Sequence, residues 1–386
     1  MIERALAPKL TALAAGFPVV MLTGPRQSGK TTLVRATFPT WPYVSLEEPD
    51  IRQLALEDPR GFLAHLGDRA ILDEVQRTPD LLSYIQSIVD DNREARFVLT
   101  GSSNLLLMEK IGQTLAGRSA VLHLLPFSLD ELRRGGHTFG RYEEAIFWGQ
   151  YPRIYDRGIA PTDFYPAYIQ TYVERDVRLI KNIADLDAFI RFSRLCAGRV
   201  GQLLNYAGLA NDAGISPNTA RAWLSILEAC YVVYRLPPHH RNFNKRLIKS
   251  PKLYFYDTGL ACSLLGIRRV EQVDTHFLKG ALFENLILNE FIKRSLNRGE
   301  RPALYFWRDS QGHEVDCLLE DREDLIPVEI KAGRTMNMSY FDNLRYWQRL
   351  AGTPPERSYV VYGGDRSLPT GHGVLLGWRD LDRLVR

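Results

Sequence analysis

"FPVVMLTGPRQSGKTTLVRATF", residues 17–38, is the stretch that decides the fold of the first part of the chain. Gly24 is followed by four unconstrained positions and then by Gly29, Lys30 and Thr31, with an apolar run before the motif and a helical pattern after it. In such a loop the glycines let backbone N–H groups turn toward phosphate oxygens, and the next helix adds its positive N-terminal end. Lys30 would meet the β- and γ-phosphates, and Thr31 would ligate Mg²⁺. The predicted nucleotide contacts are Gly24, Pro25, Arg26, Gln27, Ser28, Gly29, Lys30, Thr31 and Thr32.

A second acidic contact for the metal is expected from a neighbouring strand, and "RAILDEVQ" supplies Asp73 and Glu74 after a short apolar run. Asp73 would hold the metal, and Glu74 would orient or deprotonate the attacking water. An Asp-Glu pair in a surface loop is the alternative, and the phosphate loop upstream makes it the weaker one.

Two further positions would complete this site. "RFVLTGSSNLL" ends in small polar residues, of which Ser102 is best placed to sense the γ-phosphate, with Ser103 and Asn104 close behind. A simple turn or helix cap is the alternative there. Arg118 follows a glycine before another apolar run, where an arginine can stabilise transition-state charge in its own subunit or in a neighbour. A surface arginine is an equal alternative.

The order of these segments predicts a parallel sheet with helices on both faces. The motifs "TGPRQSGKTTL", "LDEVQ", "LTGSSN", "LAGR" and "LPFSLDEL" resemble those of bacterial and archaeal AAA-type ATPases in which an AAA domain precedes a winged helix and a C-terminal domain of unknown function. The resemblance covers essentially the whole chain. It implies that the cofactors are ATP and Mg²⁺.

The middle of the chain predicts a helix-turn-helix in "LNYAGLANDAGISPNTARAWLSILEACYVVYRL". Gly214 permits the tight turn, Ser216 can cap the second helix, and Pro217 suits its first position. That helix would present Asn218, Arg221 and Trp223. Residues 231–256 then contain Arg235, Arg241, Lys245, Arg246, Lys249 and Lys252 but no acidic residue.

A basic wing that touches nucleic-acid phosphates, with DNA favoured, is the sharper interpretation of this segment. The residues predicted to bind nucleic acid are Arg221, Arg241, Lys245, Arg246 and Lys249. A winged helix that only packs domains or subunits together is the alternative.

"LIPVEIKAG", residues 325–333, alternates so that Val328 and Ile330 share one strand face while Glu329 and Lys331 share the other. Upstream, Glu284 falls within the apolar stripe of a predicted helix in "DTHFLKGALFENLILNEFIKRSL", a stripe that includes Phe277, and "HEVDCLLE" supplies Asp316. A carboxylate within such a stripe needs a partner, a metal or a solvent-filled cleft.

This helix-Glu, strand-Asp, strand-Glu-x-Lys order is similar to the PD-(D/E)xK nuclease fold, although Val315-Asp316 replaces the Pro-Asp pair. The resemblance implies Mg²⁺ ligands in Glu284, Asp316 and Glu329, and a catalytic Lys331 that activates the attacking water. A surface strand, or a version of the fold that does not cleave, is the alternative.

Composition limits the function classes. With 45% hydrophobic and 24% charged residues the chain is expected to fold, and a net charge of +4 is too mild to indicate nucleic acid without local clustering. Cys196, Cys230, Cys262 and Cys317 form no CxxC pair, which favours a reducing cytoplasm over a disulfide framework. The apolar run near the start leads directly into the phosphate loop, so we assign it to the mature fold, and no apolar segment of about 18 residues predicts a membrane span.

We therefore predict an α/β protein of three domains: an AAA-type ATP-binding domain with a helical extension at 1–185, a winged helix at 186–270 and a restriction-endonuclease-like α/β domain at 271–386. The expected function is ATP hydrolysis coupled to action on nucleic acid, with ATP controlling a metal-dependent nuclease-like domain. The alternative is an ATP-operated switch whose C-terminal domain binds a protein partner and cuts nothing. A homo-oligomer is compatible with both.

Overall fold

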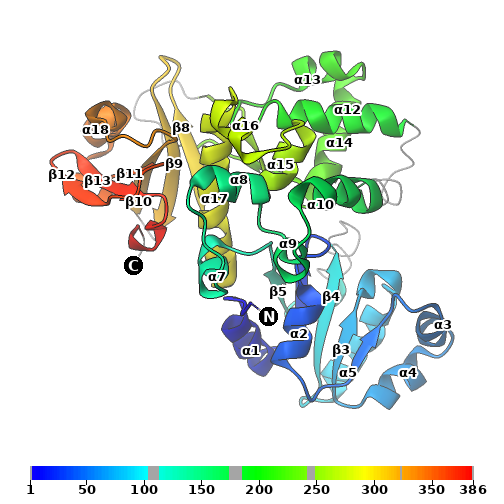
Figure 1. Cartoon of the computed structure of the whole chain (residues 1–386). Coiled ribbons are helices and arrows are strands. Elements are labelled where there is room, and N and C mark those ends of the chain that lie inside the picture. Colours follow the sequence, from blue (N-terminus) through cyan, green and yellow to red (C-terminus); the bar gives the residue numbers. More distant parts are fainter. Residues whose placement is uncertain (1, 103–112, 174–184, 241–247, 322–323, 385–386) are drawn as a thin grey trace.

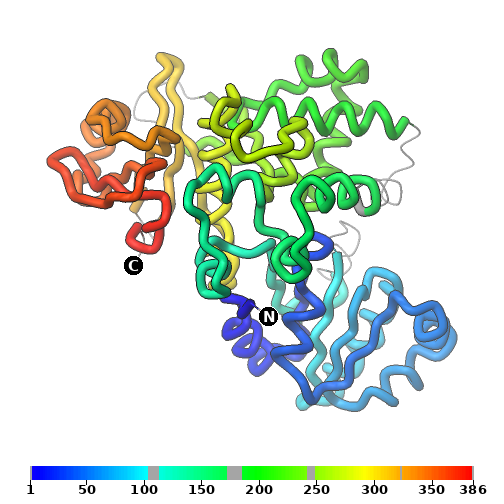
Figure 2. The backbone as a smooth tube through the Cα atoms, in the orientation of Figure 1, coloured from blue at the N-terminus to red at the C-terminus, as the bar shows by residue number. Residues whose placement is uncertain are grey.

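The computed structural model describes residues 2–102, 113–173, 185–240, 248–321 and 324–384. In Figures 1 and 2 the blue and cyan part of the chain forms one end of the molecule, and the green, yellow and red parts form the other. Five of the residues discussed above, Ser103, Asn104, Arg241, Lys245 and Arg246, lie outside the described ranges.

A five-stranded parallel sheet organises the N-terminal end, in the order β2-β3-β4-β1-β5. The strands are β1 (Val19–Gly24), β2 (Tyr43–Ser45), β3 (Arg69–Asp73), β4 (Arg96–Ser102) and β5 (Ser119–His123). Because β4 lies between β1 and β3, the carboxyl ends of these three strands stand side by side. The phosphate loop, Asp73 and Ser102 therefore share one edge of the sheet.

Helices cover both faces of this sheet, as the sequence predicts. Val20 and Leu22 of β1 pack on one side with α1 (Ala7–Gly16) and α2 (Lys30–Thr37). Val19 and Met21 alternate to the other side. The helices on that side are α3 (Pro49–Glu57), α4 (Pro59–Leu66) and α5 (Leu81–Asp91). Burial on both faces explains why β1 is apolar at nearly every position.

The middle of the chain is mostly helical (Figure 1). Its elements are α7 (Leu129–Arg134), α8 (Tyr142–Trp148), α9 (Pro152–Arg157), α10 (Pro161–Tyr168), a π-helical turn (Ile169–Val173), α12 (Leu186–Ala197), α13 (Tyr206–Ala213), α14 (Pro217–Ala229), β6 (Val233–Leu236), β7 (Lys252–Phe255), α15 (Thr258–Leu264) and α16 (Val270–Thr275). β6 and β7 form an antiparallel pair.

The turn between α13 and α14 forms as predicted. Gly214 has φ 70°, the Ser216 side chain accepts a hydrogen bond from the Thr219 backbone N–H, and Pro217 begins α14. Trp223, however, does not face outward: it is 7% exposed and packs edge-on against Phe189 and Phe192 of α12. The predicted winged-helix range thus contains α12, α13 and α14 and the antiparallel pair of β6 and β7. Their identification as a winged helix stays a prediction.

A six-stranded mixed sheet, in the order β12-β13-β11-β10-β9-β8, forms the C-terminal part. The strands are β8 (Leu304–Arg308), β9 (Glu314–Asp321), β10 (Asp324–Lys331), β11 (Tyr359–Tyr362), β12 (Leu368–Thr370) and β13 (Gly373–Gly377). Val328 and Ile330 belong to the core that includes α17 (Lys279–Asn297), and α18 (Asp342–Ala351) covers the other face through Leu344 and Trp347.

Helix α17 begins at Lys279, so the prediction that Phe277 belongs to its apolar stripe is wrong. Phe277 precedes the helix and is 83% exposed. The helical run is interrupted just before Phe277, because α16 ends at Thr275 and His276 adopts an extended backbone.

One hydrophobic core extends from Leu125 to Leu384 and includes residues of the middle segment, α17 and the C-terminal sheet. The link is also made by backbone, because Pro238, which follows β6, pairs with Phe306 of β8. In the part of the chain that the structure describes, none of the four cysteines forms a disulfide bond. In the described parts of the chain, no helix is both long and apolar enough to cross a membrane.

Candidate functional site

The phosphate loop connects β1 to α2 with a backbone that only glycine accepts at its start. Gly24 has φ 147°, and a Cβ there would lie 2.2 Å from the Leu124 carbonyl oxygen. Gly29 has φ 92° immediately before α2. Lys30 Nζ lies across the loop and donates to the carbonyl oxygens of Gly24 at 3.1 Å and Pro25 at 2.8 Å. The loop thus holds its lysine beside the positive end of α2.

Thr31 and Asp73, predicted from two separate motifs, are in direct contact. Thr31 Oγ1 donates to Asp73 Oδ2 at 2.8 Å, and Asp73 is 5% exposed. Tyr43 OH donates to the same oxygen at 2.7 Å, and Thr100 Oγ1 donates to the other. Burial and the Asp73 carboxylate raise the pKa of Tyr43, so its proton stays in this contact. Tyr43 and Thr100 were not predicted, since neither has a motif of its own.

Glu74 follows Asp73 with φ 58° and ψ 43°, in the left-handed region that a non-glycine residue seldom adopts. This backbone directs its side chain to Gln76, whose Nε2 contacts Glu74 Oε2 and donates to Ser102 Oγ at 3.0 Å. Gln76 therefore joins the predicted base to the predicted γ-phosphate sensor. Such strain persists where the surrounding structure fixes it, which is common at functional sites. Thr32, in the first turn of α2, is exposed.

Arg118 lies at the amino ends of the strands, opposite the carboxyl ends where the phosphate loop lies. It precedes β5, and its carbonyl accepts a hydrogen bond from the backbone N–H of Val19, the first residue of β1. β1 has six residues, so roughly 20 Å separates Arg118 from the phosphate loop. Its guanidinium makes two contacts with the Asp90 carboxylate, at 2.5 and 2.9 Å. Arg118 therefore does not reach the nucleotide site of its own chain, and a role in a neighbouring subunit and the surface alternative both stay predictions.

A buried polar network fixes the phosphate loop to the helices behind it. Arg4 is 8% exposed, and its guanidinium donates to the backbone oxygens of Ser28 at 2.7 Å and Leu125 at 2.6 Å. Arg4 Nε also donates to Glu131 Oε1 at 3.0 Å. Glu131, fully buried in α7, forms a capping box with Ser128. The loop backbone is thereby held to the first turn of α7.

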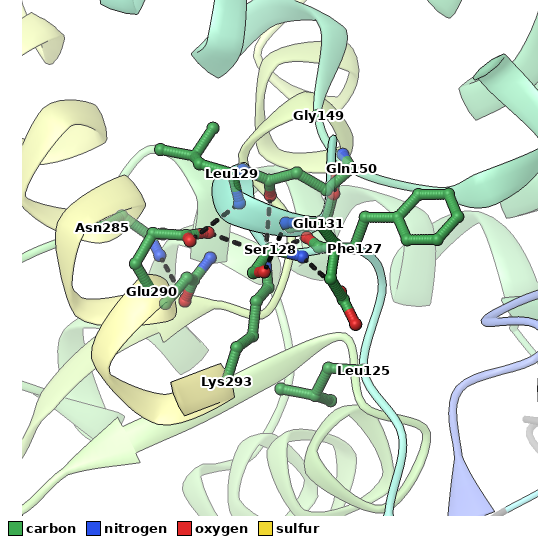
Figure 3. A network of polar contacts seen from close by, with 12 residues as sticks. Leu125, Phe127, Ser128, Leu129, Glu131, Gly149, Gln150, Asn285, Glu290 and Lys293 are labelled. Atoms are coloured by element: carbon green, nitrogen blue, oxygen red, sulfur yellow. Dashed lines mark hydrogen bonds and ion pairs between the residues drawn. The ribbon is translucent and has the colours of Figure 1, made fainter. Parts of the chain in front are cut away.

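The same turn of α7 is held to α17 (Figure 3). The backbone N–H of Leu129 donates to Glu290 Oε2 at 2.8 Å. Lys293 Nζ donates to the carbonyl of Phe127 at 2.8 Å and to Gln150 Oε1 at 2.9 Å, and forms an ion pair with Glu290. Figure 3 shows these side chains converging from α17 on the segment before α7. A continuous set of polar contacts thus connects the phosphate loop to the helix that carries Glu284.

Near the other end of α17, acidic and basic side chains of β9 and β10 lie next to one another. Pairing between β9 and β10 ends at Cys317 and Val328, and beyond it Asp316 Oδ2 accepts the backbone N–H of Ile330 at 2.8 Å. Lys331 Nζ lies 3.1 Å from Asp316 Oδ2 and 2.5 Å from Glu329 Oε2. The structure thus brings Asp316, Glu329 and Lys331 together where β9 begins and β10 ends.

Glu284 has a cationic partner that the sequence did not indicate. Lys252 Nζ of β7 lies 3.2 Å from Glu284 Oε1 and 2.5 Å from Glu314 Oε1, and it is 4% exposed. Tyr254 OH donates to Glu284 Oε1 at 2.5 Å. Lys252 therefore does not belong to an exposed basic wing. Another member of the predicted wing, Arg235, pairs with Glu228 at 2.6 Å.

The carboxylates here titrate unusually. Burial, opposed by Lys252, raises the pKa of Glu284 to about 7, and burial with the charge of Asp316 raises that of Glu329 to about 8. Burial also favours the neutral form of Asp316, but Lys331 and Lys252 outweigh it and lower its pKa. Glu329 is 0% exposed, and neither of its oxygens makes a hydrogen bond of good geometry, despite the nearby Lys331.

These donors suit a metal only in part. Oxygen atoms of Asp316 and Glu329 fit Mg²⁺, which keeps several waters and takes one or two carboxylates. Among the side chains that the structure describes, no three His, Cys, Asp or Glu residues are arranged to hold one ion. Lysines lie between the carboxylates instead, and Glu284 contacts Lys252 rather than the other two acids. The three-carboxylate metal site therefore stays a prediction.

On the middle segment, Arg221 and Lys249 are both exposed. Arg221 lies on α14, on the face that also exposes Asn218 and Ser225, with its guanidinium 5.1 Å from the centre of the Tyr206 ring. Lys249 precedes β7. Two of the five predicted nucleic-acid contacts are thus accessible, and the other three lie outside the described residues.

Comparison with known proteins agrees with the AAA-type assignment of the N-terminal part. A family model described as AAA domain matches residues 16–133, and two domains of unknown function, DUF8612 and DUF4143, match residues 140–271 and 279–381. Together with the parallel sheet and the Thr31–Asp73 contact, the first match defines an AAA-type P-loop ATPase domain.

The chain is 30% identical over 386 residues to the uncharacterized proteins Rv2008c of Mycobacterium tuberculosis and Mb2031c of Mycobacterium bovis, covering 97% of this chain and 82% of each relative. It belongs to the same family as these mycobacterial proteins.

Two solved structures are similar in part. The Walker-type ATPase PABY2304 of Pyrococcus abyssi matches 68% of this chain and 96% of its own, with 16% identity and a TM-score of 0.44. A signal transduction ATPase with numerous domains, PH0952 of Pyrococcus horikoshii, matches 78% of this chain and 47% of its own, with 12% identity and a TM-score of 0.28.

Proposed function

We propose that the protein binds and hydrolyses Mg-ATP at the shared edge of β1, β3 and β4. The hydrogen bond from Thr31 Oγ1 to Asp73 Oδ2 is the observation that carries the proposal. A hydroxyl and a carboxylate in contact beside a phosphate loop supply the hard oxygen donors that Mg²⁺ takes. When bound, the ion would neutralise charge on the β- and γ-phosphates.

The chain's own groups then have separate roles. Lys30 would exchange the two loop carbonyls for phosphate oxygens, which are stronger partners for an ammonium group. Glu74 would accept a proton from the attacking water, and Gln76 would keep Glu74 aligned with Ser102. The Arg4 contact with Ser28 would keep the loop backbone in its binding conformation.

Two variants test this assignment. Lys30→Ala should weaken Mg-ATP binding in a fluorescent-nucleotide titration. Glu74→Gln should bind normally but release phosphate 10² to 10⁴ times more slowly, the usual range for a lost general base. Unchanged phosphate release in both variants would refute the site.

We also propose that the ATPase acts on nucleic acid, DNA in particular, in a reducing cytoplasm. The exposed face of α14 with Asn218 and Arg221, and the exposed Lys249, support this proposal. Four cysteines without a disulfide bond in the described structure suit that compartment. The neutralised Arg235 and buried Lys252 weaken the electrostatic argument, so binding would rest on fewer cations than the sequence count.

The C-terminal part is proposed as a metal-dependent nuclease-like domain under ATP control. The contacts among Asp316, Glu329 and Lys331 favour it, because Lys331 lies where it could orient a water beside two carboxylates. Incubation of labelled DNA and RNA with Mg²⁺ or Mn²⁺, with and without ATP, tests the proposal. Cleavage that Asp316→Asn and Lys331→Ala both abolish would support it. If there is no cleavage under any of these conditions and the C-terminal part binds no Mn²⁺, the alternative of an ATP-operated switch that binds a protein partner is favoured.

A further inference from the structure

Two carboxylates of the C-terminal part form ion pairs with a lysine from a different part of the chain. We define the carboxylate cluster as Glu284, Glu314, Asp316 and Glu329. Lys252 is the first residue of β7, the strand that pairs with β6 of the middle segment. Its ammonium nevertheless contacts Glu284 on α17 and Glu314 on β9. A residue outside the predicted nuclease-like domain thus lies inside its carboxylate cluster.

The backbone of Lys252 is held in place on both sides. The Leu253 backbone N–H donates to the Gln202 carbonyl at 3.1 Å, and the Gly201 N–H donates to the Leu253 carbonyl at 2.8 Å. Asn285, next to Glu284 on α17, bonds both the N–H and the carbonyl of Phe255. Because β7 is fixed against α17, the side chain of Lys252 alone decides whether its charge stays in the cluster.

The charges of the cluster are nearly balanced without any metal. With every carboxylate ionised, four negative charges face three cations, since Lys252 and Lys331 are joined by Arg308, which pairs with Glu314 at 3.2 Å. The raised pKa values of Glu284 and Glu329 mean that protons also neutralise part of this charge, and a bound divalent ion would displace them. In the fully ionised cluster, withdrawing the charge of Lys252 leaves two formal negative charges unmatched. That is the charge of one divalent ion, and like charges held a few ångströms apart in a buried site repel strongly.

We propose that Lys252 is a built-in cation that keeps divalent metal out of the carboxylate cluster, so that the middle segment inhibits the C-terminal site. This inference rests on the proposed metal-dependent function of that site. Release needs only a side-chain movement. The Glu314 side chain is 20% exposed and that of Glu284 13%, so the ammonium can move toward the rim with Glu314 and leave Glu284.

Calorimetric titration of the full chain with Mn²⁺ in the absence of nucleotide tests the proposal. All variants are made in an Asp73→Asn background, which removes the ligand that Mn²⁺ would use at the nucleotide site. Lys252→Met should bind Mn²⁺ at least 10-fold more tightly than the parent, whereas Lys252→Arg, which keeps the charge, should bind like the parent. Adding Asp316→Asn to Lys252→Met should remove the gained binding and so assign it to the cluster.

Thermal melting establishes whether each variant is folded. If Lys252→Met does not fold, Lys252→Gln takes its place, and the same gain in Mn²⁺ affinity is expected. Parent and Lys252→Met binding Mn²⁺ equally well would overturn the role of Lys252 but leave the proposed metal site intact. If no variant binds Mn²⁺, both the inhibition and the metal-dependent function are wrong.

Discussion

Breaking the Arg4–Glu131 ion pair should destabilise the ATPase part and weaken nucleotide binding together. Both side chains are buried, at 7% and 0% exposure, and they meet at 3.0 Å. Removing one partner of such a pair leaves a buried charge and costs about 3–5 kcal/mol, whereas replacing both by neutral groups costs less. We therefore expect Arg4→Met and Glu131→Gln each to cost about 3 kcal/mol.

The size of each loss is set by the contacts that remain. Without Arg4, the Glu131 carboxylate keeps the backbone N–H groups of Ala5 at 2.7 Å and Ser128 at 2.8 Å, which places the cost at the lower end of the range. Without Glu131, Arg4 keeps the carbonyls of Ser28 and Leu125. The double variant should be more stable than the sum of the two losses implies, by about 1–3 kcal/mol.

The assay is urea denaturation of the four proteins of this double-mutant cycle, followed by circular dichroism. Strictly additive losses would refute the pairing. Mg-ATP affinity is measured in parallel on the folded variants. Arg4→Met should lower it on the order of tenfold, because the loop carbonyl of Ser28 loses a charged hydrogen bond, but Glu131→Gln should lower it less. Equal affinities in all four proteins would contradict the role of Arg4 in shaping the loop.

Three further outcomes are expected. Arg118→Ala should bind ATP normally yet lose on the order of 10³ in turnover, and mixing it with Lys30→Ala should restore some phosphate release; turnover that is independent of protein concentration, with no rescue, would exclude a role in trans. Arg221→Ala and Lys249→Ala should each reduce the slope of log affinity for duplex DNA against log salt by about 0.9, and an unchanged slope would leave α14 as a packing element. Glu284→Gln should destabilise the chain by about 1–3 kcal/mol in urea denaturation, because Lys252 loses one of its two carboxylates; a wild-type midpoint would show that Glu314 alone satisfies the lysine.

The sequence predicted those features of the nucleotide site that depend on local spacing. Gly24 to Thr31 fixes the loop, and Asp73 ends an apolar strand, so a parallel sheet brings both to one edge. The distance of Arg118 from the nucleotide site can be predicted in the same way, because a residue that precedes a strand of a parallel sheet lies at the amino ends of the strands.

Contacts between distant segments were not predictable by such reasoning. Arg4 and Glu131 are 127 positions apart, and each, taken alone, has the pattern of an ordinary helix-flanking charge. The sequence predicts Lys252 on a basic surface because the segment around it contains no acid, whereas its partners come from α17 and β9. Side-chain burial of this kind depends on how β7 packs against α17, which periodicity within either segment does not reveal.

The hydrogen bonds between Asn285 and the backbone of Phe255 also affect the order in which the chain can fold during translation. Asn285, which holds β7, lies 30 residues after Phe255, and β8, the neighbour of β6, is complete only at Arg308, about 50 residues after Phe255. At roughly 5–20 residues per second, the paired β6 and β7 wait for several seconds before α17 and β8 can pack against them. The five strands of the ATPase sheet are complete by His123 and face no such delay. A chaperone that attends this protein during translation should therefore engage it at the paired β6 and β7, well after the nucleotide site has formed.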